Sequence, residues 1–322
     1  MNLQFSLNNI KQKPDKKISY YCSPNVRSSK FTHLMKLVLY KSGPKNIKKY
    51  MEDNIDAVNY VNQKGWTALM IACRNSNTYS SNYYVQWLLD HNADTEKKEY
   101  DDGYTALILA VMDSNEDSNM ETVKMLIQGG ADVDNTDNEG WTPLMFACNY
   151  YDTTSSIETI DLLIDANAKI DVKNNENDTA LSILCSNQSD LKVIEKLLKK
   201  GANVNNLNKD GETPLLMAIK KENVDMVKML LKYGAHIDYA NSEGETPLFM
   251  AVKNNNINTT KLLLQAGSRI DVVNNKGNSS IICFVIPNNF AKRYKAVLPL
   301  LFCKLTLIPL LINCFIISIS VA

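Results

Sequence analysis

The stretch Gly211-Glu-Thr-Pro-Leu215 returns 33 residues later as Gly244-Glu-Thr-Pro-Leu248. Related stretches that keep the glycine, the threonine and the leucine begin upstream at Gly65, Gly103 and Gly140. Alignment on the threonine gives spacings of 38, 37, 37, 34, 33 and 33 residues between Thr67, Thr105, Thr142, Thr179, Thr213, Thr246 and Ser279. A fixed period near 33 residues is the signature of stacked structural repeats, so the sequence predicts a solenoid.

The residues at the expected helix boundaries indicate two helices in each repeat. Threonine is a good N-cap, because its hydroxyl can accept a hydrogen bond from an amide of the first helical turn. Pro143, Pro214 and Pro247 follow directly, at a position where a missing N–H costs nothing. The second helix is expected to end at residues that tolerate a left-handed conformation, namely Asn92, Gly130, Asn167, Gly201, Gly234 and Gly267.

Equivalent positions in the repeats carry the candidate core. A leucine stands two residues after each cap threonine, and an alanine stands five residues after it in every good repeat except one, which has Leu184. Burial of one leucine contributes about 1.5–3 kcal/mol. A single repeat cannot bury its own apolar face, so the repeats are expected to stack on one another.

Together these features resemble the ankyrin repeat, a helix–turn–helix followed by a β-hairpin with a Thr-Pro-Leu-His-x-Ala signature. The resemblance covers about residues 28–280 and implies an all-α repeat solenoid with about six good copies between degenerate terminal repeats. The composition, which is rich in asparagine and prefers lysine to arginine, also resembles that of the ankyrin proteins of giant DNA viruses of amoebae. One departure is that other residues replace the signature histidine: Met70, Ile108, Met145, Ser182, Leu216 and Phe249. Stability is therefore expected to depend more on apolar packing.

The repeat boundaries divide the chain into five segments. We expect a disordered leader at 1–27, a degenerate capping repeat at 28–62, the ankyrin array at 63–276, a degenerate last repeat at 277–295 and a hydrophobic tail at 296–322. A basic tether is an alternative role for the leader, which contains four lysines.

The hydrophobic tail leaves three interpretations open. Its last part, Leu305–Ala322, has 18 uncharged residues, about the lower limit for a helix that spans a bilayer. A basic cluster at 292–295 would remain on the cytosolic side of such a transmembrane anchor. However, Pro299 and Pro309 favour a poor helix, so a capping helix on the last repeat or a frame-altered end are the alternatives.

Extra polar residues separate the two helices of the first three good repeats, at 75–82, 113–119 and 150–156. Short insertions in surface loops cost little free energy, so they account for the longer spacings without a change of fold. They are expected either to form a contact ridge or to be neutral expansions.

Composition and motifs argue against catalysis, cofactor binding and metal binding. The 35 basic and 35 acidic residues cancel, which leaves no overall positive charge for nucleic acid. No pair of the three histidines has metal-ligand spacing, and the seven cysteines contain no C-x-x-C pair. Cys73, Cys148 and Cys185 share one inner-helix position and are expected in the core. We expect a non-enzymatic monomer in a reducing, intracellular compartment, such as the host cytoplasm for a viral protein.

The resemblance to ankyrin repeats implies that a partner protein binds the concave face formed by hairpin tips and first helices. The residue before each cap threonine is expected to be exposed on that face, which gives three aromatic residues and then acidic ones: Trp66, Tyr104, Trp141, Glu212 and Glu245. The ends of the first helices are expected to border the same face with Arg74, Tyr150, Lys220, Lys221 and Lys253. Alternatively, the three aromatic residues pack only on adjacent hairpins.

The favoured function is a protein-binding scaffold that recruits host proteins. A membrane ankyrin protein, anchored by 296–322 to position a partner at a membrane, is the first alternative. A ubiquitin-ligase substrate adaptor is the second, although neither flank contains a recognisable ligase-docking motif.

Overall fold

The computed structural model describes residues 31–39, 43–76, 82–112, 120–151, 155–187 and 190–278 of the 322. The chain divides into two compact units, which we call unit 1 (Met1–Ala168) and unit 2 (Lys169–Ala322). The hydrophobic tail, the whole leader, most of the last repeat and the greater part of the three insertions lie outside the described residues. Across the described ranges, no helix has the length and apolar character needed to cross a bilayer.

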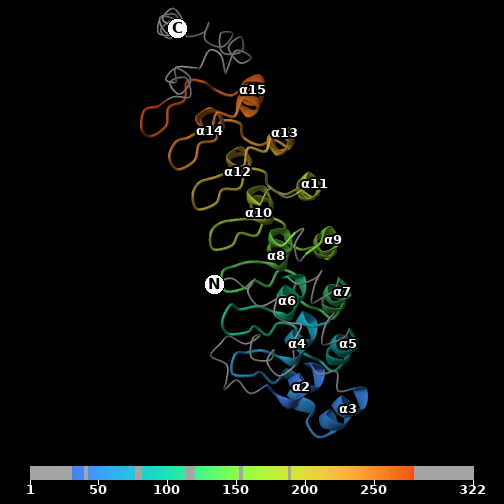
Figure 1. The fold of residues 1–322 in the computed structure, drawn as a ribbon. Coiled ribbons are helices and arrows are strands. Elements are labelled where there is room, and N and C mark those ends of the chain that lie inside the picture. Colours follow the sequence, from blue (N-terminus) through green and yellow to red (C-terminus); the bar gives the residue numbers. More distant parts are fainter. Residues whose placement is uncertain are drawn as a thin grey trace, which may run out of the picture. The chain divides into compact units, whose positions relative to one another are not determined.

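Unit 1 consists of helix pairs (Figure 1). Its described elements are α2 (His33–Leu39), α3 (Pro44–Glu52), the 3-10 helix η2 (Ile55–Asn59), α4 (Ala68–Arg74), α5 (Asn82–Asp90), α6 (Ala106–Met112), α7 (Met120–Gln128), α8 (Pro143–Asn149) and α9 (Ile157–Asp165). The first helices α2, α4, α6 and α8 pack on one another, and the second helices α5, α7 and α9 do the same. The pair α2–α3 lies in the segment expected to form the degenerate N-terminal repeat.

Unit 2 repeats the same arrangement in the yellow-green to orange part of the ribbon (Figure 1). Its helices are α10 (Ala180–Ser186), α11 (Leu191–Lys199), α12 (Pro214–Lys220), α13 (Val224–Lys232), α14 (Pro247–Lys253) and α15 (Ile257–Gln265). First helices α10, α12 and α14 pack in succession, and second helices α11, α13 and α15 pack beside them. Both units therefore have the all-α repeat solenoid fold expected from the sequence.

The cap threonines begin the first helices as predicted. Each hydroxyl accepts a hydrogen bond from the backbone N–H three residues later, at 3.1–3.3 Å, in Thr67, Thr105, Thr142, Thr179, Thr213 and Thr246. In two repeats the residue that replaces the signature histidine returns a bond to the cap. Met70 Sδ accepts from the Thr67 N–H at 3.4 Å, and Ser182 Oγ accepts from the Thr179 N–H at 2.8 Å.

The second helices end in left-handed residues, also as predicted. Positive φ occurs at Asn92, Gly130, Asn167, Gly201, Gly234 and Gly267. After α5, the Asn92 N–H donates to Leu89 O at 3.1 Å and the Ala93 N–H donates to Leu88 O at 3.0 Å. These two bonds form a Schellman motif, which satisfies carbonyls that would otherwise lack partners at the helix end.

Turn-closed loops occupy the place of the expected β-hairpins, and the described part of the chain contains no β-strand. In the loop before α14, Asn241 Oδ1 accepts from the N–H groups of Glu243 and Glu245, at 3.0 and 2.9 Å. An asparagine or aspartate makes the same pair of bonds five residues before the cap position, as Asn62, Asp137, Asn174, Asn208, Asn241 and Asn274. This residue was not among the predicted ones, although its fixed distance from the threonine is a signal in the sequence.

Neighbouring loops within a unit are joined through their backbones. In unit 1 the Asn138 N–H donates to Asp102 O, and in unit 2 the Asn275 N–H donates to Glu243 O, at 2.9 and 3.0 Å. The carboxylates of Asp171 and Asp238 also accept hydrogen bonds from backbone N–H groups of the following repeat. The loops therefore form a linked edge in each unit.

The core lies between the first and second helices of each unit. The leucines two residues after the cap threonines and the small residues five after them are at most 1% exposed. In the first repeat, Leu34, Met35 and Val38 of α2 are fully buried. The predicted core pattern is confirmed.

Candidate partner-binding face

The two rows of candidate binding residues meet in pairs. We call the residue before the cap threonine position −1 and the residue seven after it position +7. The Arg74 guanidinium lies over the Trp66 ring, 5.8 Å from its centroid. Glu245 and Lys253 form an ion pair of 2.8 Å, and Glu212 pairs with Lys220 in the same way. In three repeats, position −1 therefore folds back onto the last turn of its own first helix.

This folding back corrects the expected exposure of position −1. Trp66 is only 6% exposed, and Glu212 and Glu245 are each 7% exposed. Tyr104 and Trp141 are half-buried. The physical reason is that each loop turns the side chain toward the helix that follows, where an aromatic face or a carboxylate finds a partner. The lysines of the pairs, rather than the glutamates, remain in contact with solvent.

An aromatic cluster forms around Phe146 of α8 in unit 1. Tyr104 meets the Phe146 ring edge-on at 5.6 Å, and Trp141 lies tilted against it at 5.3 Å between centroids. Tyr150 stacks parallel to Phe146 at 6.5 Å. Phe146 itself is 5% exposed, whereas the other three side chains keep an exposed part. The rings of Tyr104 and Trp141 thus pack against a first helix.

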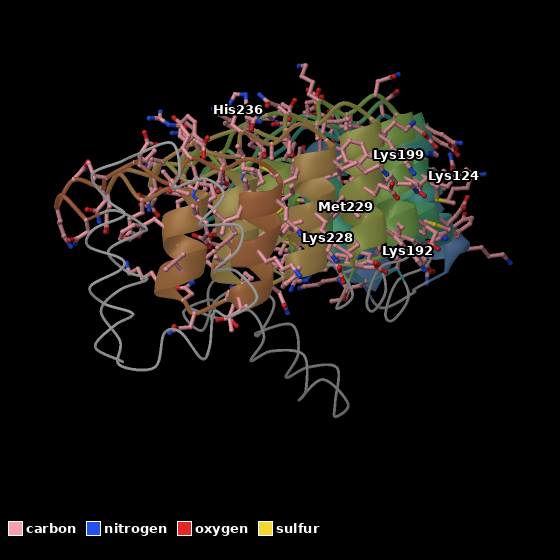
Figure 2. All side chains as sticks on the ribbon, turned by 90° about the horizontal axis from the view of Figure 1, so that it is seen from above. Lys124, Lys192, Lys199, Lys228, Met229 and His236 are labelled. Atoms are coloured by element: carbon pink, nitrogen blue, oxygen red, sulfur yellow. The ribbon has the colours of Figure 1, made fainter. Side chains whose placement is uncertain are left out.

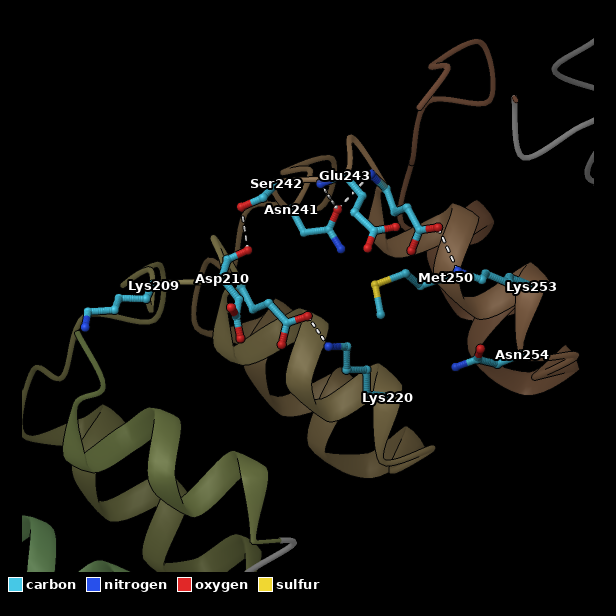
Figure 3. Close-up of a pocket in the computed structure, with 11 residues that line it drawn as sticks. Lys209, Asp210, Lys220, Asn241, Ser242, Glu243, Met250, Lys253 and Asn254 are labelled. Atoms are coloured by element: carbon cyan, nitrogen blue, oxygen red, sulfur yellow. Dashed lines mark hydrogen bonds and ion pairs between the residues drawn. The ribbon is translucent and has the colours of Figure 1, made fainter. Parts of the chain in front are cut away.

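A polar cavity of about 680 Å³ lies in unit 2 between α12, α14 and the loops that precede them (Figure 3). Both glutamate–lysine pairs stand at its wall, and the Met250 side chain is its main apolar surface. Lys221, the remaining residue of the predicted set, is exposed and does not line the cavity. The lining residues are Lys209, Asp210, Glu212, Lys220, Asn241, Ser242, Glu243, Glu245, Met250, Lys253 and Asn254.

Acidic residues are concentrated in unit 1 around the aromatic cluster. From Asp90 to Asp165 the sequence has 18 acidic and three basic residues, although the whole chain is neutral. Burial and the charge of Glu99 raise the pKa of Asp102, and burial raises the pKa of Asp137 despite its backbone hydrogen bonds. The total charge of the chain hides this segregation, whereas the charges counted by region reveal it.

Three buried thiols occupy the expected inner-helix position. Cys73, Cys148 and Cys185 are free and fully buried, which confirms them as core residues. Burial raises the pKa of all three, that of Cys185 to about 12. In the described ranges, no group of histidine, cysteine or acidic side chains could hold a metal ion.

The raised pKa values predict inert thiols in the native protein. Only the thiolate reacts readily, and a thiol whose pKa is raised stays protonated at about pH 8. We therefore expect iodoacetamide to leave Cys73, Cys148 and Cys185 unlabelled at that pH, and to label them after unfolding in urea. Peptide mass spectrometry measures the labelled fraction. Equal labelling rates in native and unfolded protein would contradict the expectation.

Comparison with known families matches residues 33–118, 112–208 and 181–276 to ankyrin repeats. The chain belongs to the ankyrin repeat family, which confirms the resemblance seen in the sequence. Ankyrin repeats are protein–protein interaction modules, and the family is generally non-enzymatic. Among solved structures, the ankyrin repeat domain of Bcl-3 is similar, with a TM-score of 0.60 and 22% identity over 69% of this chain and 95% of that domain. At that identity the likeness shows the fold alone.

Curated relatives come from Acanthamoeba polyphaga mimivirus. Ankyrin repeat protein L122 is 47% identical over 68 residues, which are 20% of this chain and 11% of the relative. Ankyrin repeat protein L91 is 36% identical over 90 residues, which are 25% of this chain and 14% of the relative. The matched stretch spans only a small part of each relative.

Proposed function

We propose that the chain is a non-catalytic scaffold that binds a protein of the host cell through the row of −1 and +7 side chains. One observation carries the proposal. The framework of each repeat is constant, whereas the chemistry of this row changes from repeat to repeat. The row contains an aromatic ring with an arginine in the first good repeat and aromatic rings in the next two. In two repeats of unit 2 it contains a glutamate with a lysine.

Constant framework and variable surface are what selection for a partner produces, because function lies in sites placed on a fold. The exposed ammonium groups of the lysines, which pair with buried glutamates, offer charge to a partner. The half-buried aromatic rings offer it apolar area. The mimivirus relatives favour a host protein as the partner and the inside of the host cell as the location.

The second helices provide a matched control face. Lys228 of α13 and Lys124 of α7 project from second helices (Figure 2). Lys228 is 57% exposed and Lys253, on the proposed binding face, is 55% exposed. The two lysines therefore differ in the face they occupy rather than in accessibility.

A site-specific photo-crosslinker tests the proposal. We expect p-benzoyl-phenylalanine at Lys253 or Asn149 in the full chain to capture one discrete protein from Acanthamoeba lysate. The same group at Lys228 or Lys124 is expected to capture none, because those positions lie on the opposite helix layer. Gel shifts and mass spectrometry identify the adducts. Adducts of equal yield from both faces would contradict the assigned face.

A further inference from the structure

Three repeats supply a cation from position +7 to the side chain at position −1. Arg74 covers the Trp66 ring, while Lys220 and Lys253 bind Glu212 and Glu245. In each case the cation comes from the last turn of the first helix. We call the space beside the −1 side chain the slot. In these three repeats a positive charge from position +7 occupies the slot.

The middle repeats lack that cation. Position +7 is Met112 in one repeat of unit 1 and Asn149 in the next. In the described part of the chain, no basic group lies over the ring of Tyr104 or Trp141. Both rings are half-buried and pack on Phe146 of α8 instead.

Carboxylates lie close to both residues. The Asp137 carboxylate accepts from the backbone N–H of Trp141 at 2.7 Å, and that of Glu99 accepts from the backbone N–H of Tyr104 at 3.2 Å. Burial raises the pKa of the Tyr104 hydroxyl, and so does the negative charge of Asp102 and, more weakly, that of Asp137.

Two lysines lie near these loops, and both have partners. Lys64 binds Asp101 at 2.7 Å, and Lys98 donates to the Thr136 carbonyl. With only three basic residues between Asp90 and Asp165, the surroundings of the cluster stay strongly negative. Aromatic faces beside carboxylates favour a cation.

We propose that the aromatic cluster of Tyr104, Trp141, Phe146 and Tyr150 binds an arginine side chain from a basic segment of the partner protein. The proposal rests on the proposed function and names the partner's chemistry at this site. Arginine fits better than lysine, because its planar guanidinium stacks on rings while its N–H groups reach carboxylates. The Arg74–Trp66 pair shows the same contact within the chain. Phosphate-bearing partners are disfavoured, since the acidic surroundings repel them.

The test uses the full chain and two synthetic peptides. One is a fluorescein-labelled peptide with three Gly-Ser-Arg units, and the other replaces each arginine by citrulline, which has nearly the same shape but no charge. We expect the arginine peptide to bind at least about tenfold more tightly in fluorescence anisotropy.

An internal arginine should compete for the slot. Asn149→Arg supplies at position +7 what Arg74 supplies to Trp66, so it is expected to weaken arginine-peptide binding about tenfold. Gln128→Arg is the matched control, because it adds the same charge to unit 1 at an exposed position on α7. It is expected to weaken binding less than about twofold. Circular dichroism checks that both variants remain folded.

Two results would overturn the proposal. Equal affinity for the arginine and citrulline peptides would show that no cation is recognised. Equal weakening by Asn149→Arg and Gln128→Arg would show that the peptide responds to the net charge of unit 1 and not to the cluster. If either occurs while crosslinks still form at Lys253, the scaffold function stands and only the arginine site is lost.

Discussion

Replacement of Phe146 by alanine is expected to lower the free energy of unfolding by about 3–5 kcal/mol. Phe146 is 5% exposed and stands between three aromatic side chains, so its removal leaves a cavity that the surrounding rings cannot fill without moving. Urea unfolding followed by circular dichroism measures the loss. Hydrogen exchange of α8 peptides assigns that loss to unit 1, because a repeat array can unfold in steps.

Phe146→Met provides the control for this prediction. Methionine occupies the equivalent position in two repeats of unit 2, as Met217 and Met250, so the helix accepts it there. It keeps most of the buried volume, and the expected cost is below about 1.5 kcal/mol. If alanine and methionine cost the same, the aromatic cluster does not hold α8 by packing.

Gly244→Ala is expected to cost about 2–4 kcal/mol, the second largest effect. Gly244 has φ +76°, a conformation that an alanine adopts only with strain. An added Cβ would also lie 2.6 Å from Asn275 Oδ1 and 2.9 Å from the Asn275 backbone nitrogen. The following loop would have to move, and the bond from the Asn275 N–H to Glu243 O would be weakened.

The variant Gly234→Ala separates the cost of backbone strain from the cost of a steric clash. Gly234 has φ +88°, but an added Cβ would meet nothing within 4 Å. Its expected cost is therefore the strain alone, about 1–2 kcal/mol. Both variants lie in unit 2, so their urea midpoints can be compared directly. A Gly234→Ala cost as large as that of Gly244→Ala would mean that the linked loops contribute little to stability.

The fold was predictable because its signals are local and repeated. A threonine cap, a glycine or asparagine end and a leucine at a fixed distance each act within one or two turns of chain, and their recurrence fixes the period. The same reasoning placed Cys73, Cys148 and Cys185 in the core. It also placed Arg74 and Lys253 at the ends of first helices.

The exposure of the candidate binding residues was not predictable in the same way. Trp66, Glu212 and Glu245 were expected in solvent because they vary between repeats, yet each is buried against a side chain eight residues later. Variation between repeats shows only that the framework does not fix a residue. It does not show which way the loop turns the side chain.

By itself, the sequence determined the repeat, its helices and its buried positions, because capping, turn and burial preferences belong to single residues and their near neighbours. Only the tertiary structure decided which loop residue pairs with which residue of the following helix. It also decided that Tyr104, from the preceding repeat, joins Trp141 and Tyr150 on Phe146. Those contacts depend on how a loop folds back and how one repeat stacks on the next. Such geometry is set by packing between elements, which no short stretch of sequence contains.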